Sequence, residues 1–375
     1  MTSQSISVEL AGLRGEIASS FDDFVAYARL HLQPLIAPLA GEAPISATLR
    51  WHEGSPPPRL EADPTLRDME RVDRDLYRGE GRLAWFRIDD MPGLQLRFEW
   101  DGERLRVEGD YYYWLSADRK RDALKRLVYR KRLPALRQRR FTTLLYYLLY
   151  YPCFWWLERH DRLHPMHAAG VEHDDGVVVL AGPSGVGKST LSTGLASTDG
   201  AKLLSDTFLL HQGIVIRPVR EPLLLDAWSR NWLGDGAALL RPIEWRYCLD
   251  RNGFHWPQER LSAGGPARLL LFPHRAPTHY VRPLSPTQAQ GQIDAGNHIV
   301  NDLRRYWAFA AALEMLDASP LSAARAASLA ALVREVPAYE VGLTKDMTRS
   351  QVAEVVAALD LGAHAPASGR AARAQ

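Results

Sequence analysis

The clearest chemistry in this sequence lies in nine residues, G-P-S-G-V-G-K-S-T, from Gly182 to Thr190. They satisfy the Walker A pattern G-x-x-x-x-G-K-[ST], in which the backbone amides of a glycine-rich turn surround phosphate oxygens. The apolar residues 177–181 before the turn predict a strand, and residues 189–196 after it predict a helix. A strand, a turn and a helix in this order direct N–H groups and the positive helix end at one point. The segment predicts a nucleoside triphosphate site.

The side chains of this segment suggest separate roles. Lys188 is expected to reach the β- and γ-phosphates, and the Ser189 hydroxyl to complete a Mg²⁺ shell. The expected ligands are ATP and Mg²⁺, although the sequence does not choose between ATP and GTP. The other residues expected to surround the nucleotide are Gly182, Pro183, Ser184, Gly185, Val186, Gly187 and Thr190.

A histidine upstream is expected to fold back onto this loop. Residues 167–173 precede Asp-Asp-Gly at 174–176, and Asp-Gly between two apolar runs is a hairpin signal. A turn of two or three residues would bring His167 opposite residue 183 or 184. An imidazole there could move a proton or stabilise transferring charge near pH 7, or could only hydrogen-bond to the loop. We expect the flanking histidines to lie at the surface: His160, His164 and His173.

Acidic residues after the loop helix are the candidates for metal and proton chemistry. Residues 202–210 read as one strand, and Asp206 within it could hold Mg²⁺ or accept a hydroxyl proton. A solvated turn acid is the alternative. Glu221, after a returning strand at 214–219, is a weaker metal candidate, and Asp226 is weaker still. The short Gln212-Gly213 turn requires antiparallel strands, which argues against a wholly parallel sheet.

Composition describes an ordinary soluble chain. Its 375 residues are 46% hydrophobic and 24% charged, with a net charge of +2 that gives no argument for nucleic acid. The N-terminus lacks the basic start and apolar core of an export signal, which predicts a cytoplasmic protein. Cys153 and Cys248 have no metal-binding spacing and are expected to be plain thiols in a reducing compartment.

The remaining patterns predict four consecutive segments. A small α+β domain, with a helix at 21–30 and strands at 83–88, 94–100 and 105–111, is followed by a connector and an α/β domain with antiparallel hairpins. In the α/β domain, further strands are expected at 268–273 and 337–343, with helices between 299 and 332 and at 351–359. The predicted boundaries are 1–118, 119–165, 166–360 and a disordered tail at 361–375.

The connector combines a basic run with an aromatic run. Residues 119–140 contain eleven lysines and arginines, which indicate either a solvated helix face or a docking surface for an acidic partner or anionic lipid. Few aromatic residues interrupt this run, so nucleic acid is the least favoured partner. Residues 144–157 are too short to span a bilayer and contain Pro152. They predict a buried helix, with interfacial membrane contact as the alternative.

The segment from His167 through residue 210 resembles the bacterial HPr kinase/phosphorylase family, and more closely its HPr-kinase-related members. The resemblance rests on a histidine fifteen residues before the first loop glycine, on G-x-S-G-x-G-K-S, and on the acidic strand end Leu203-Leu204-Ser205-Asp206. Residues 147–164, Leu270-Phe272-Pro273 and Pro337-Ala338-Tyr339-Glu340 also fit, so the similarity spans about 144–343. It implies a nucleotide-binding core similar to that of phosphoenolpyruvate carboxykinase, and an assembly of several subunits. The N-terminal domain is not covered.

Two departures limit what the resemblance implies. The bifunctional family has a second acid at the strand end, its proton-handling base, where this chain has Thr207. The family's signature segment for phosphorylase activity and metal binding is not found, so phosphorylation of HPr is not implied. The expectation that remains is an ATP-dependent serine kinase of a protein or peptide, with His167, Lys188 and Asp206 as catalytic residues and Ser189, Asp206 and Glu221 near the metal. A nucleotide-dependent switch without phosphotransfer and a kinase of a small-molecule hydroxyl are the alternatives.

Overall fold

The computed structural model divides into two compact units that are not consecutive along the chain. Unit 1 comprises Met1–Leu163, Pro242–Gly253 and Arg305–Ser322, and unit 2 comprises the rest. The connector expected at 119–165 therefore belongs to unit 1 up to Leu163, because its helices pack on that unit's sheet. The structure describes residues 3–38, 41–54, 57, 63–88, 90–116, 118–173, 176–183, 185–244, 252–317, 320–344 and 346–363.

Unit 1 is built on an eight-stranded sheet in the order β1-β2-β3-β8-β7-β6-β5-β4. The pairs β2–β3 and β3–β8 are parallel and the others antiparallel. The expected hairpin at Asp101-Gly102 is confirmed, and the Asp101 carboxylate accepts hydrogen bonds from the amides of Glu103 and Arg104. The strands are β1 (Gln4–Leu10), β2 (Leu13–Ser19), β3 (Ile45–Glu53), β4 (Glu70–Asp73), β5 (Leu76–Gly79), β6 (Arg82–Trp85), β7 (Leu94–Trp100) and β8 (Leu105–Tyr113).

The aromatic run at 144–157 is a buried helical segment, as expected, and Pro152 does not interrupt it. The turn before the proline widens into a π-helix, in which the Tyr151 amide bonds to the Tyr146 carbonyl, so the helix continues through Pro152. Burial raises the pKa of the Cys153 thiol to about 12. No helix within the described residues has the length and apolar character needed to cross a bilayer. The helices of unit 1 are α1 (Asp22–His31), η1 (Gln33–Leu35), η3 (Pro64–Leu66), α2 (Arg119–Val128), α3 (Leu133–Leu145), η4 (Tyr146–Tyr150), α4 (Tyr151–His160) and most of α8 (Asn301–Leu313).

Unit 2 contains a nine-stranded mixed sheet in the order β12-β10-β11-β18-β14-β13-β9, with β20 beside β18 and β19 beside β20. The pairs β11–β18 and β18–β20 are parallel, whereas β10–β11 and β13–β14 are antiparallel hairpins. The fold is therefore mixed α/β and not a wholly parallel sheet. Its strands are β9 (His164–Met166), β10 (Ala168–His173), β11 (Gly176–Ala181), β12 (Lys202–Ser205), β13 (Leu209–Gln212), β14 (Val215–Pro218), β18 (Gly265–Arg275), β19 (Tyr280–Leu284) and β20 (Ala338–Leu343), and β15 (Leu223–Leu225), β16 (Arg241–Pro242) and β17 (Asn252–His255) form a small separate sheet.

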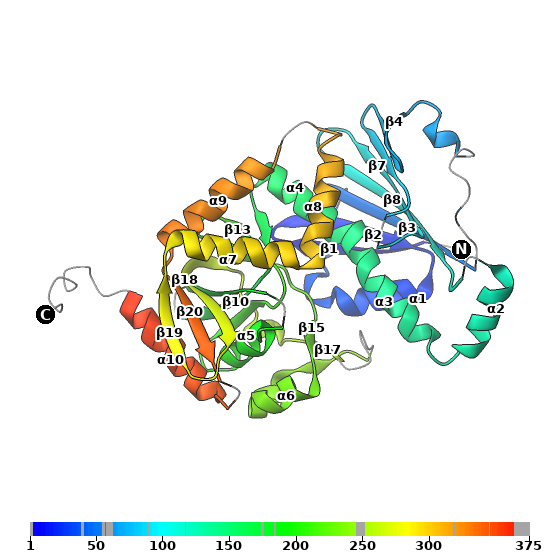
Figure 1. Cartoon of the computed structure of the whole chain (residues 1–375). Helices are drawn as coiled ribbons and strands as arrows, with labels where there is room; N and C mark the ends of the chain where they lie inside the picture. The colour runs from blue at the N-terminus through cyan, green and yellow to red at the C-terminus, as the bar shows by residue number, and fades with distance from the viewer. Residues whose placement is uncertain are drawn as a thin grey trace, which may run out of the picture. The chain divides into compact units, whose positions relative to one another are not determined.

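The central strand β11 is buried on both faces because helices cover both sides of the sheet (Figure 1). Val178 and Leu180 pack into a core with α5, α6 and α10, whereas Val177 and Val179 pack into another with α7 and α9. This alternation explains why the strand reads as a continuous apolar run. The helices of unit 2 are α5 (Lys188–Ala196), α6 (Ala227–Leu233), η5 (Gly234–Leu239), η6 (Gln258–Arg260), α7 (Pro286–Ile299), α9 (Ser322–Glu335) and α10 (Arg349–Ala363).

Two expectations about this unit were wrong, and one helix was not expected. Residues 202–210 are not one strand, because β12 pairs with β10 while β13 pairs with β9, and the chain bends between them at Asp206. The helices expected between residues 299 and 332 are present as α8 and α9, whereas α7, which begins at Pro286, was not expected. The last helix continues to Ala363 and includes the start of the expected tail, of which residues 364–375 lie outside the described part.

Candidate functional site

The glycine-rich loop (residues 182–190) joins β11 to α5, as the sequence predicts. Its glycines Gly182, Gly185 and Gly187 have φ angles of 138°, 87° and 100°. Residues with a Cβ rarely adopt such angles, and the space around Gly185 and Gly187 is open. Conformation, not crowding, therefore requires glycine at these positions. Ser184 lies outside the described residues.

The N-terminus of α5 faces this loop. The first hydrogen bond of the helix runs from the Leu191 amide to the Gly187 carbonyl at 2.9 Å, so the preceding amides remain available to an anion. The buried Thr190 hydroxyl lies 3.1 Å from the Ser229 hydroxyl of α6 and fixes the helix against its neighbour. The half-buried Ser189 side chain, in contrast, makes no hydrogen bond to any described residue. Its hydroxyl is therefore available as an oxygen ligand.

Lys188 is held inside the loop that it follows. Its ammonium donates hydrogen bonds to the Gly182 and Pro183 carbonyls at 2.8 Å and 2.9 Å. Burial lowers the pKa of Lys188 to about 8, and the negative charge of Asp206 opposes that shift. Lys188 thus remains mostly protonated at neutral pH but is poorly solvated, which favours interaction with an anion.

His167 lies between β9 and β10, beside the loop. The register of β10 and β11, extended by one residue, places it opposite Gly182 and not residue 183 or 184, because the two strands pair as far as His173 and Gly176. The His167 amide donates a 3.0 Å hydrogen bond to the Asn297 side chain of α7. The buried imidazole packs edge-on against Phe208, with ring centroids 5.9 Å apart.

The His167 ring is uncharged. Burial and then the positive charge of Lys188 lower its pKa to about 3, while the nearby Thr207 backbone acts weakly in the opposite direction. Neither ring nitrogen has a hydrogen bond of normal geometry to a described residue. This result argues against proton transfer by the ring near pH 7. It favours the other expected role, a polar contact to charge that develops during transfer.

Asp206 follows β12 at the bend that separates it from β13. Its carboxylate is buried and accepts a 3.2 Å hydrogen bond from the Ser192 hydroxyl of α5. A 2.6 Å bond from the Ser205 hydroxyl to the Val219 carbonyl holds the segment leading to Glu221 beside the start of this bend. Both Glu221 oxygens are shielded from solvent.

The structure thus brings His167, Lys188 and Asp206 together from three separate segments. Asp226 is instead the N-cap of α6, where its carboxylate accepts a 2.7 Å hydrogen bond from the Ser229 amide. His160 is exposed as expected, and His173 is partly buried. The expectation that His164 lies at the surface was wrong, because β9 is buried beside β13 and the His164 ring faces that of His211 at 5.8 Å.

Sequence reasoning missed Ser192 and the contribution of α7. A Cβ atom at Gly296 of α7 would lie 3.4 Å from the Gly182 backbone, and the Asn297 side chain accepts a hydrogen bond from the His167 amide. Asn297 continues the four-residue spacing of the buried Ala289 and Ile293. A polar residue on that buried stripe was the signal that could have identified it.

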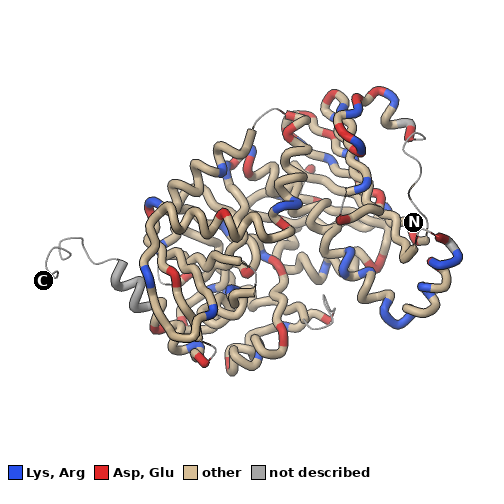
Figure 2. Tube along the Cα trace, in the orientation of Figure 1, with Lys and Arg blue, Asp and Glu red and all other residues tan. Residues whose placement is uncertain are grey.

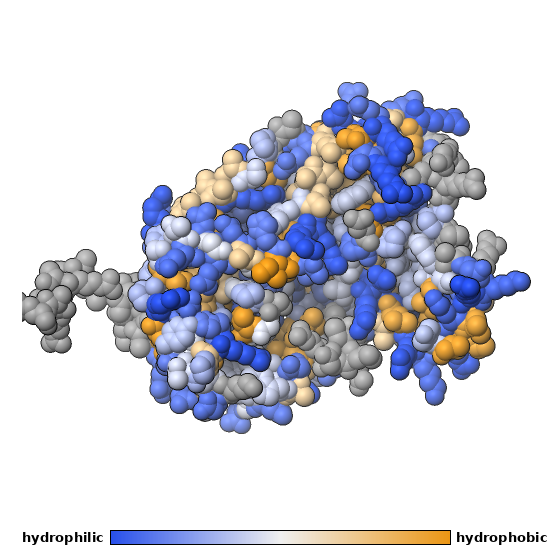
Figure 3. All heavy atoms as spheres, viewed as in Figure 1, coloured by the Kyte–Doolittle hydropathy of each residue, from blue (hydrophilic) through white to orange (hydrophobic). Residues whose placement is uncertain are grey.

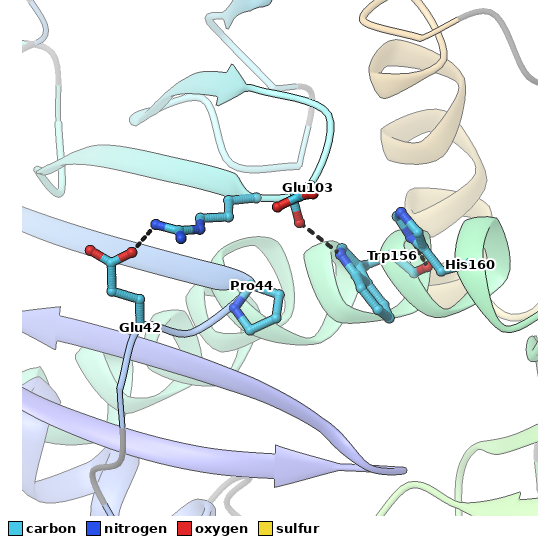
Figure 4. Close-up of a pocket in the computed structure, with 6 residues that line it drawn as sticks. Glu42, Pro44, Glu103, Trp156 and His160 are labelled. Carbon is cyan, nitrogen blue, oxygen red and sulfur yellow. Dashed lines mark hydrogen bonds and ion pairs between the residues drawn. The ribbon is translucent and has the colours of Figure 1, made fainter.

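One hollow on the described surface lies in unit 1. It measures about 310 Å³ and is lined by Glu42, Pro44, Glu103, Arg104, Trp156 and His160 (Figure 4). Trp156 and His160 stack with ring centroids 4.0 Å apart, and the Trp156 indole donates to the Glu103 carbonyl at 3.3 Å. None of the expected site residues lines this hollow.

Comparisons with known proteins do not assign the chain: no protein-family model matches it, and no curated protein matches it. Within the described residues, no three His, Cys, Asp or Glu side chains form a group able to hold a metal ion by themselves. A functional assignment therefore rests on the local geometry of the loop and its neighbours.

Proposed function

We propose that this chain is an ATP-dependent phosphotransferase that transfers the γ-phosphoryl group to a hydroxyl, on a serine of a protein or peptide. The observation that carries the proposal is the convergence of three separate segments on the glycine-rich loop. The charge of Asp206 acts on Lys188, and the charge of Lys188 acts on His167. A loop with these neighbours supplies the positioning and charge stabilisation on which phosphoryl transfer depends.

In this proposal the loop amides and Lys188 bind the β- and γ-phosphates. Mg²⁺ in nucleotide sites is held by one or two carboxylates together with phosphate oxygens. The available Ser189 hydroxyl and the buried Asp206 carboxylate fit that requirement, with Glu221 as a further candidate. When bound, the metal would neutralise charge that accumulates on the phosphates. Asp206 would also orient or deprotonate the acceptor hydroxyl, while neutral His167 would contact the transferring group.

The finer fold assignment belongs to the same proposal. Antiparallel hairpins β10–β11 and β13–β14 beside the parallel strands β11, β18 and β20 agree with a nucleotide-binding core of the HPr kinase and phosphoenolpyruvate carboxykinase type. The loop follows the carboxyl end of β11, where open α/β sheets bind ligands.

A second candidate function is a nucleotide-dependent switch that binds ATP without transferring phosphate. Thr207 next to Asp206 favours it, because the resembling family has its catalytic base at that position. Incubation of the purified chain with γ-labelled ATP and a lysate of its source distinguishes the two functions. An acid-stable labelled protein supports the kinase, and a labelled low-mass product supports a small-molecule kinase. Bound but untransferred nucleotide supports the switch.

The first prediction concerns His167. We expect His167→Ala to slow phosphotransfer about 100-fold while the Kd for ATP changes less than about twofold, because the ring contacts transferring charge only in the transition state. Since the pKa of His167 is about 3, the ratio of wild-type to variant rates should stay constant between about pH 5 and about pH 8. His173→Ala, on the same hairpin, is the control. Unchanged turnover in His167→Ala would remove the ring from the mechanism.

A second prediction uses the backbone of the loop. Gly187→Ala should weaken ATP binding about tenfold or more, because alanine at a φ of 100° is strained by about 1–2 kcal/mol and moves the amides of the loop. Gly200→Ala is the matched control, since its φ is 77°, its surroundings are also open, and it lies beyond the other end of α5. Calorimetric titration measures the ATP affinity of both variants, and their Tm values report whether each variant is stably folded. Equal ATP affinity in the two variants would contradict the anion-binding role of the loop.

A further inference from the structure

The helix α2 leaves a hydrophobic face uncovered. Leu124, Leu127, Val128 and Tyr129 are 61%, 70%, 67% and 41% exposed, whereas single exposed apolar residues are the norm elsewhere. Figure 3 shows hydrophobic atoms on the surface among strongly hydrophilic ones, where Figure 1 places α2. Four neighbouring apolar side chains in water are unfavourable, which indicates a surface that is covered in function.

The opposite face of α2 anchors the helix, so the apolar face cannot turn inward. Asp122 is buried and accepts hydrogen bonds from the Leu115 and Ser116 amides. Arg126, one turn later, bonds to the Tyr113 carbonyl at 3.0 Å and pairs with Glu53. Residues at i and i+4 share a helix face, and this pair fixes α2 to the end of β8.

Lysine and arginine positions are frequent along α2 and the turn after it (Figure 2). Arg126 pairs with Asp122 and Glu53, and Arg137 pairs with Asp23 and Glu53, but most of the other cations remain exposed. The only acids of residues 118–140 are Asp118, which caps the helix, and the buried Asp122. Exposed cations with no ion pair to a described residue are Lys120, Arg121, Arg130, Lys131, Arg132 and Arg139.

We infer that α2 and the turn after it, residues 119–132, dock on a phospholipid bilayer with anionic headgroups. Leu124, Leu127 and Val128 enter the acyl boundary, Tyr129 lies at headgroup level, and the cations pair with lipid phosphates. Nucleic acid offers no counterpart for the apolar residues, and a purely acidic surface leaves them in water. The aromatic run at 144–157, in contrast, is buried and contributes nothing to this surface.

Sedimentation of the full-length protein with vesicles tests the inference. Vesicles of phosphatidylcholine containing phosphatidylglycerol should bind the chain, and vesicles of phosphatidylcholine alone should not. Because each basic residue near an anionic surface changes affinity about fivefold, Arg130→Gln/Lys131→Gln/Arg132→Gln should weaken binding about 100-fold. Leu127→Ser/Val128→Ser should weaken it about tenfold or more.

Two controls match these variants. Lys202→Gln/Arg106→Gln/Arg275→Gln removes three exposed charges elsewhere, and Ile299→Ser removes an apolar side chain that is 61% exposed. Both should bind like the wild type. If the charge variant and its control lost vesicle binding equally, the effect would depend only on net charge, and the inference would be overturned. Binding to soluble polyglutamate with no binding to anionic vesicles would also overturn it and indicate an acidic protein partner.

Discussion

Lys188→Ala is expected to abolish phosphotransfer, with a rate reduced about 10³-fold or more, because the variant lacks the one cation inside the loop. Lys188→Arg should not restore activity. The Lys188 ammonium occupies a buried position between two loop carbonyls, and a planar guanidinium cannot replace it there. Lys202→Ala, at the exposed start of β12, is the control and should retain full activity. Transfer of label from γ-labelled ATP measures all three.

The same residue predicts a dependence of ATP affinity on pH. The pKa of Lys188 is about 8, below the usual lysine value, so the free protein loses this positive charge as the pH rises through that value. Binding of the anionic nucleotide must then include uptake of a proton, and affinity should fall about tenfold per pH unit above about pH 8. In Lys188→Ala the affinity should be weak and independent of pH in this range. An equally steep decrease in the variant would assign the dependence to another group.

The loop itself could be predicted because its backbone geometry is visible in the residue types. The positive φ angles of Gly182, Gly185 and Gly187 require glycine, and the apolar β11 before them is recognisable by composition. The β10–β11 hairpin was likewise indicated by its Asp-Gly signal. The register was predicted one or two residues away from its actual position, because the sequence did not show that the strands pair as far as His173 and Gly176.

The features that were missed depend on tertiary contacts. The bend at Asp206 lies inside an apolar run, and only the pairing of β12 and β13 with different strands separates them. The helix α7 contains glutamines and glycines with few apolar residues. The apolar periodicity that would have predicted its buried face, which includes Asn297, was therefore weak. The basic run was also ambiguous, because a solvated face and a docking face have the same composition. The burial of Asp122 and the exposure of Leu127 are the observations that support the proposed docking surface.

Asp206→Asn should, like Lys188→Ala, cause a large loss of phosphotransfer activity. We expect the rate of phosphotransfer to fall about 10³-fold, because the amide cannot accept a proton and is a poorer ligand for Mg²⁺. The Kd for ATP without Mg²⁺ should change little, since the loop and Lys188 remain. The Mg²⁺ concentration needed for half of the maximal rate should increase. Asp199→Asn, an exposed acid between α5 and β12, is the control and should behave as the wild type.

The charge of Asp206 also supports Lys188, which gives this variant a second measurable effect. Because Asp206 opposes the decrease in the Lys188 pKa, its neutralisation should move the pH at which ATP affinity falls below about 8. Ser192→Ala removes the hydroxyl that bonds to the Asp206 carboxylate and to the Ser189 carbonyl, but it removes no charge. It should therefore lower the rate less, without moving that pH. A variant Asp206→Asn that transfers phosphate at the wild-type rate would exclude the carboxylate from catalysis. The nucleotide-dependent switch would instead be favoured if the wild-type chain and the variant bound ATP equally well and neither transferred phosphate.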